Sequence, residues 1–162
     1  MSLIVVQDIA ALKEHLNSEV AVTDYIEVTQ DRINRFAAVT EDWQWIHTDT
    51  ERASRESPLG KTVVHGFLIL SFLSYFVNSA VQIQGIQQIV SCGLNSVRFL
   101  GSAPAGGRIR GRVALKEYAD GPGFTTVIWH VTVECEGIRF PACTANWMVR
   151  YYSQTVSETV HS

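Results

Sequence analysis

The pattern of apolar positions predicts helices in the first half of the chain. Apolar residues recur with a period near 3.6 over about 8–16, where Asp8 can cap the first turn. The same period follows Thr29, a second candidate cap, and ends at about residue 40. Between these helices, residues 25–28 alternate like a short strand. A third, shorter helix is expected after Thr48 or Asp49.

The most apolar segment begins at Gly66. Its apolar residues fall on nearly every side of a helix, so the pattern predicts a helix that is buried on most sides: Phe67, Leu68, Leu70, Phe72, Leu73, Phe76 and Val77. The segment is interrupted by serine and is too short to span a bilayer. A buried helix within one soluble domain is therefore expected.

Strand signals fill the second half of the chain. Four segments are expected to be extended: 89–99, 108–118, 124–134 and 142–152. The third is rich in β-branched and aromatic residues, and arginines alternate with other residues at the start of the second. Turn residues at 120–123 and 136–137 separate the last three. Long antiparallel strands that follow a buried helix predict the α+β class, and they suggest a sheet wrapped around that helix.

Length and composition limit the possible functions. The chain has 162 residues, 46% of them apolar and 18% charged, and its net charge is −3. One soluble domain with an ordinary core fits these values, and the charge gives no reason to expect nucleic acid as a partner. The N-terminus lacks the pattern of a signal peptide, and no membrane span is expected. We therefore expect a cytoplasmic protein.

Cysteine usage predicts neither a metal site nor disulfides. The three cysteines have no metal-ligand spacing, and each is expected to be a free, buried thiol: Cys92, Cys135 and Cys143. A reducing compartment agrees with this usage. No metal and no resident cofactor are predicted.

Candidate chemistry lies where the second helix ends. Asp42 precedes His47 by five residues, and a carboxylate beside an imidazole can hold a water molecule and take its proton. The same spacing fits a structural explanation, in which Asp42 ends the helix and His47 packs beside tryptophans. From the spacing alone, the structural explanation is favoured.

A second candidate is the dipeptide His65–Gly66 at the start of the apolar helix. Glycine there lets a ligand approach free backbone amides, which favour developing negative charge. From the dipeptide alone, a close-packing or N-cap role for Gly66 is favoured. Ser71 and Ser74 interrupt the helix, where a hydroxyl commonly bonds back one turn, and no nucleophile elbow surrounds them.

Together these motifs resemble the MaoC-type dehydratases, including the (R)-specific enoyl-CoA hydratases and the nodulation-protein-N-like group. The family motif is an Asp, four residues and a His, then a short helix, then His-Gly opening a hydrophobic helix. Here it is carried by 38–49 and 58–68, and 93–99 is similar to the first long strand of the nodulation-protein-N-like members. The resemblance covers most of residues 20–152.

The resemblance implies a hot-dog fold, in which a curved antiparallel sheet wraps around one long central helix, and a homodimer. By position, Asp42 and His47 match the catalytic pair and the amide of Gly66 matches the oxyanion site. Other matches near the substrate are His65, Ser74 and Asn95. We expect 1–162 to form a single MaoC-like domain with a core of about 20–152, an N-terminal helix of about 8–16 and a polar tail of 153–162.

The implied activity is reversible addition of water to a trans-2-enoyl thioester, giving a 3-hydroxyacyl thioester. The substrate would be a thioester of coenzyme A or of an acyl carrier protein, with no cofactor. Two alternatives remain: a non-catalytic acyl-binding hot-dog subunit and an acyl-CoA thioesterase. The chain departs from the family at Glu41, where many members have glycine, and at Gln44–Trp45, where the best-known hydratases have Asn-Pro.

Overall fold

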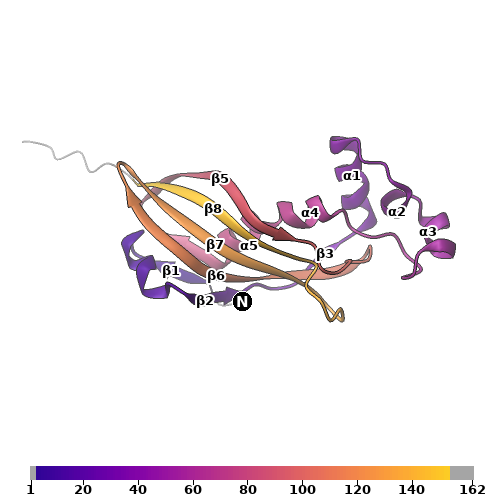
Figure 1. Cartoon of the computed structure of the whole chain (residues 1–162), viewed down its shortest axis with the longest axis horizontal. Helices are drawn as coiled ribbons and strands as arrows, with labels where there is room; N and C mark the ends of the chain where they lie inside the picture. The colour runs from indigo at the N-terminus through magenta and orange to yellow at the C-terminus, as the bar shows by residue number, and fades with distance from the viewer. Residues whose placement is uncertain (1–2, 154–162) are drawn as a thin grey trace, which may run out of the picture.

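The computed structural model describes residues 3–153, and it has the α+β class that the sequence predicts (Figure 1). The strands are β1 (Ile4–Val6), β2 (Ser18–Val22), β3 (Ile26–Val28), β4 (Val81–Ile83), β5 (Ile86–Arg98), β6 (Gly107–Gly121), β7 (Phe124–Cys135) and β8 (Cys143–Ser153). The helices are the 3₁₀ helix η1 (Ala10–His15), α1 (Gln30–Thr40), α2 (Trp45–Thr48), α3 (Thr50–Glu56), α4 (Gly66–Ser71) and α5 (Leu73–Ala80).

One antiparallel sheet organises the molecule. Its strand order is β2-β6-β7-β8-β5, and β3 pairs with β6 beyond β2. The four long strands that the sequence predicts are all present: β5, β6 and β7 are longer than expected, and β8 has the expected length but is shifted by one residue. The turns after β6 and β7 contain Gly123 at φ +81° and Gly137 at φ +75°, conformations that glycine adopts without strain.

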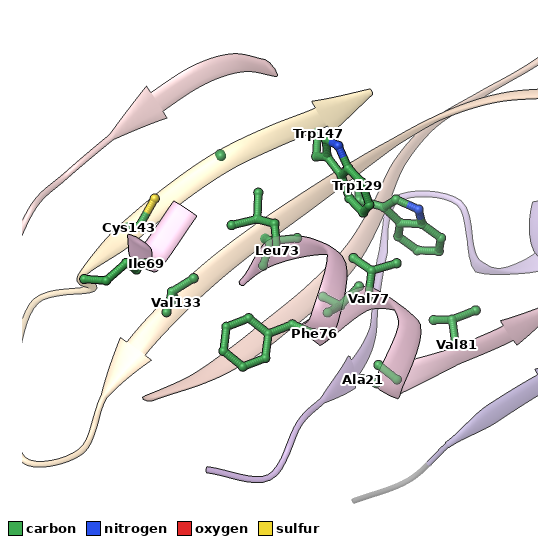
Figure 2. Packing of buried hydrophobic residues seen from close by; sticks show 14 of the residues in the cluster. Ala21, Ile69, Leu73, Phe76, Val77, Val81, Trp129, Val133, Cys143 and Trp147 are labelled. Atoms are coloured by element: carbon green, nitrogen blue, oxygen red, sulfur yellow. The ribbon is translucent and has the colours of Figure 1, made fainter. Parts of the chain in front are cut away.

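Helix α5 lies against the inner face of this sheet, as the hot-dog fold requires. Its buried residues point at the strands, where Trp129 of β7 and Trp147 of β8 close one side of the core (Figure 2). Phe76 lies directly on the backbone of β6: a Cβ added at Gly111 would be 2.6 Å from its ring. The absence of a side chain at Gly111 is therefore what lets the helix and the sheet approach this closely.

The central helix is not one continuous segment, contrary to the prediction. It divides into α4 and α5 at Phe72, whose amide bonds to the Ile69 carbonyl at 3.1 Å, three residues back instead of four. Ser71 donates to the Phe67 carbonyl at 2.7 Å, the bond back along the helix that its position suggested. Such side-chain bonds compete with the helical ladder and locally bend or tighten it.

The prediction that this helix is buried on most sides is also wrong for the single chain. Phe67 is 68% exposed and Tyr75 is 49% exposed. The apolar character of the segment therefore exceeds what the core of one chain covers. Large exposed apolar residues of this kind, when they lie close together, mark surfaces that bind something.

The N-terminal region differs most from the prediction. Asp8 does cap the first turn, since its Oδ1 accepts from the Ala11 amide at 2.8 Å, but the segment forms the 3₁₀ helix η1. Strands β1, β2 and β4 were not predicted. β1 pairs with β4 in parallel, and β2 adds to the edge of β6. Three-residue strands have too few positions to show a period.

Helices α1, α2 and α3 gather at one end of the sheet (Figure 1). Thr29 caps α1 as predicted, accepting from the Arg32 amide, and Asp49 caps α3. α1 ends at Glu41, which adopts the left-handed conformation at φ +58°. The position where family members often have glycine is therefore one whose backbone favours glycine.

The cysteines, the end of β8 and the membrane prediction can each be compared with the structure. Cys135 and Cys143 are free and buried as predicted, whereas Cys92 is free but exposed, because it lies on the edge strand β5. The polar tail was expected from 153, but Ser153 ends β8 and 154–162 lie outside the described residues. Within residues 3–153, no helix is long and apolar enough to cross a membrane.

Candidate active site

The structure brings Asp42, His47 and His65 together at the end of the molecule where α1–α3 lie. Asp42 follows the end of α1, His47 is in α2, and His65 precedes α4. One ligating atom from each side chain lies within 4.8 Å of the others. Asp42 is partly buried, while His47 and His65 are 8% and 2% exposed.

A backbone contact fixes the ring of His47. Its Nδ1 lies 2.7 Å from the Val63 carbonyl, which can only accept, so Nδ1 carries the proton and donates. In the neutral imidazole, Nε2 therefore has a free lone pair. Val63 also donates its own amide to the Ile46 carbonyl at 2.9 Å, so the same residue holds both the turn and the ring.

The surroundings of His47 keep its imidazole neutral. Burial lowers the pKa of His47, and the neighbouring His65 lowers it further. The Val63 carbonyl and the Asp42 carboxylate act in the opposite direction, but the net pKa lies below the ordinary value of 6.5. At neutral pH the ring is consequently a proton acceptor with its acceptor atom defined.

His65 lies beneath this pair. Its ring stacks on His47, with 3.8 Å between ring centroids and 25° between the planes, and Phe36 of α1 covers it at 5.1 Å. Its Nε2 donates to the backbone carbonyl of Asp42 at 3.1 Å. The remaining nitrogen, Nδ1, is buried and has no hydrogen-bond partner among the described residues.

These three side chains are also of the types that bind Zn²⁺. Zinc–nitrogen bonds of about 2.0 Å lie in the plane of each imidazole, so two histidine ligands of one ion direct their lone pairs at a common point. The rings of His47 and His65 are stacked almost face to face, so an ion bound in the plane of one ring would lie outside the plane of the other. The geometry therefore suits proton transfer better than metal binding.

Gly66 is the first residue of α4, so the helix itself makes no use of its amide. Glycine also has a packing reason here, because a Cβ would lie 3.2 Å from the Phe99 ring. Phe99 is 46% exposed, and its ring is 6.0 Å from that of Phe67. Both explanations given for Gly66 from the sequence thus remain, and the contact with Phe99 supports the packing one.

Ser74 and Asn95 lie on other elements than the pair, α5 and β5. Ser74 is exposed on α5, eight residues after Gly66, or about 12 Å along a helix. Asn95 is exposed on β5, in register with Asn146 of β8. Neither side chain bonds to Asp42 or His47 within residues 3–153, so their role at the site stays a prediction.

Two residues of the site had no signal in the sequence. Val63 acts through its carbonyl, which any residue could supply. Gln30, the first residue of α1, donates to the His47 carbonyl at 2.8 Å and accepts from the buried Thr62 hydroxyl. Gln30 thereby links α1 to α2 and to the loop segment that leads to Val63. Contacts between residues 17 and 32 positions apart leave no periodic trace in a sequence.

A pocket of about 450 Å³ is lined by Val63, whose carbonyl holds His47, and by Ile46 and Trp45. The guanidinium of Arg52 lies 4.2 Å from the centre of the Trp45 ring. The tryptophan that replaces the family's proline is therefore part of this wall, one residue before Ile46 and two before His47.

Comparison with known proteins finds relatives over most of the chain. Residues 12–136 match the family model described as MaoC like domain. The chain is 37% identical to 3-hydroxyacyl-thioester dehydratase Z of Mycobacterium tuberculosis (strain ATCC 25618 / H37Rv) over 146 residues, which are 90% of this chain and 96% of that protein. It is 38% identical to nodulation protein N of Rhizobium leguminosarum bv. viciae over 147 residues, 86% of this chain and 88% of that one.

Among solved structures, the unliganded R-hydratase PhaJ1 from Pseudomonas aeruginosa superposes with a TM-score of 0.66. The superposition covers 85% of this chain and 83% of that chain, at 14% sequence identity. A likeness at such low identity concerns the fold alone, and it confirms the hot-dog fold that the sequence motif implied.

Proposed function

The chain belongs to the family of MaoC-like domains, and from this premise we propose that it adds water reversibly to the C2=C3 bond of a trans-2-enoyl thioester. One observation carries the proposal. His47 lies within reach of the Asp42 carboxylate, and its Nε2 is free because Nδ1 is fixed on the Val63 carbonyl. A base with a lowered pKa beside a hydrogen-bond acceptor is what activation of water needs.

In the hydration direction, water lies between Asp42 and His47. The carboxylate accepts one of its hydrogens in a hydrogen bond, and Nε2 of His47 takes the other as the oxygen attacks C3. The C3–O bond forms while the π electrons move through C2 to the thioester oxygen, giving an enolate. The proton held by His47 then goes to C2, and the product is a 3-hydroxyacyl thioester. Acid–base catalysis of this kind contributes about 10²–10⁴-fold.

We place the thioester oxygen at the amide of Gly66. The enolate concentrates negative charge on that oxygen, and an amide aimed at developing charge stabilises the transition state more than the ground state. Gly66 follows His65 directly in the sequence, and the ring of His65 stacks on His47, which supports this placement. Thioesters of coenzyme A and of acyl carrier protein share the reacting atoms, and we propose the coenzyme A thioester as substrate.

A second copy of the chain is part of the proposal. β5 is an edge strand of 13 residues, which within 3–153 pairs only with β8, and its residues are mostly exposed. Phe67 and Phe99, both exposed and in contact with each other, lie beside it. Pairing of two such edges in a homodimer covers the open strand and the exposed face of α4.

The test is hydration of crotonyl-CoA by the purified full chain, monitored as the loss of the enoyl absorbance. Asp42→Asn and His47→Ala should each fold and lose at least about 100-fold in kcat. His130→Ala is the matched control, because His130 bonds to Asn146 on the sheet and belongs to no part of the site. Turnover near that of the wild type in both site variants would contradict the assignment of Asp42 and His47 as the catalytic pair. Release of free thiol without loss of the enoyl would instead identify a thioesterase.

A further inference from the structure

We infer that His65 is a positioning residue for the Asp42–His47 pair, acting from beneath it and not on the substrate. Its side chain is 2% exposed, so a ligand in the site has no access to its ring. Beside its contact with Phe36, it touches both residues of the pair: the ring stacks on His47, and Nε2 donates to the Asp42 carbonyl. The inference rests on the proposed function of that pair.

The hydrogen bond from His65 fixes the backbone position from which the Asp42 side chain extends. Asp42 follows directly after Glu41, the left-handed residue at which α1 ends, and it belongs to no helix. Regular structure therefore does not fix its backbone carbonyl, and the bond from His65 across 23 residues does. Reacting groups displaced by about 1 Å can lose about 10²-fold in rate. Holding this carbonyl is thus a contribution to turnover, not to binding.

The stacking acts on the charge of His47. At 3.8 Å between centroids, two imidazolium ions would repel each other in a partly buried site, so one ring opposes protonation of the other. The titratable groups acting on His47 are Asp42, which favours its cation, and His65, which disfavours it. From α1, the uncharged ring of Phe36 contacts the stack.

Two variants separate these contributions. His65→Gln places an amide nitrogen the same number of bonds from Cα as Nε2, so it keeps the donor to Asp42 and removes the titratable ring. His65→Phe keeps a ring for stacking and removes the donor. We expect His65→Phe to lower kcat about 10- to 100-fold with little change in KM, and His65→Gln to retain most of kcat. In both, the acidic limb of the kcat/KM profile should move to higher pH, because His47 is protonated more easily.

The decisive measurement does not require activity. Titration of the wild-type His47 imidazole by NMR should show its proton on Nδ1 and the ring neutral to below pH 6.5. In His65→Gln, the midpoint of His47 should rise. An unchanged midpoint of His47 in this variant overturns the inference. Failure of the proposed function is seen separately, as full turnover in Asp42→Asn and His47→Ala.

Discussion

The closest contact between the central helix and the sheet yields a quantitative prediction. A Cβ at Gly111 would lie 2.6 Å from Cγ, 2.7 Å from Cβ and 3.0 Å from Cδ2 of Phe76. Carbon atoms prefer a separation of about 3.5–4.0 Å, so Gly111→Ala must open a gap of about 1 Å. Phe76 is fully buried, and the clash involves the root of its side chain, which cannot move without α5. Overpacking of this kind costs about 1–3 kcal/mol.

For a domain of this size, we expect Gly111→Ala to lower Tm by about 3–10 °C in thermal denaturation. Gly93→Ala on β5 is the matched control, since nothing lies within 4 Å of its added Cβ. That substitution also removes glycine's freedom from the unfolded chain and should be neutral or stabilising by up to about 1 kcal/mol. Combining Gly111→Ala with Phe76→Leu should cost less than the sum of the two. Equal Tm shifts for the two glycine variants would refute the argument.

Two further predictions concern the site. Because the pKa of His47 is lowered and its neutral form is the active one, kcat/KM for crotonyl-CoA should be constant near neutral pH and fall only below pH 6.5; a fall with a midpoint above 6.5 contradicts this. Glu41→Gly should raise the stability by about 0.5–1 kcal/mol without loss of activity, since Glu41 holds φ +58°, and a lower denaturation midpoint in urea contradicts this.

The local parts of the fold were predictable because their signals are local. α1 was predicted from Thr29 and the helical period that follows it. β6, β7 and β8 were predicted from long extended segments separated by glycine turns at 120–123 and 136–137. The three-residue strands β1 and β4 could not be predicted, because their pairing is decided by partners about 77 residues away. The exposure of Phe67 was also mispredicted, since the period shows only that a residue is apolar and not what covers it.

The site divides in the same way. The sequence by itself determined which residue types are available: Asp42, His47 and the dipeptide His65–Gly66, whose spacing carried the family motif. It did not determine that the two imidazoles stack, that the Val63 carbonyl selects the tautomer of His47, or that Gln30 holds α2 in place. Those facts depend on the approach of segments 16 to 18 residues apart, which only the packed chain brings together. The sequence therefore supplies the reacting groups, and the tertiary structure decides which nitrogen can take a proton.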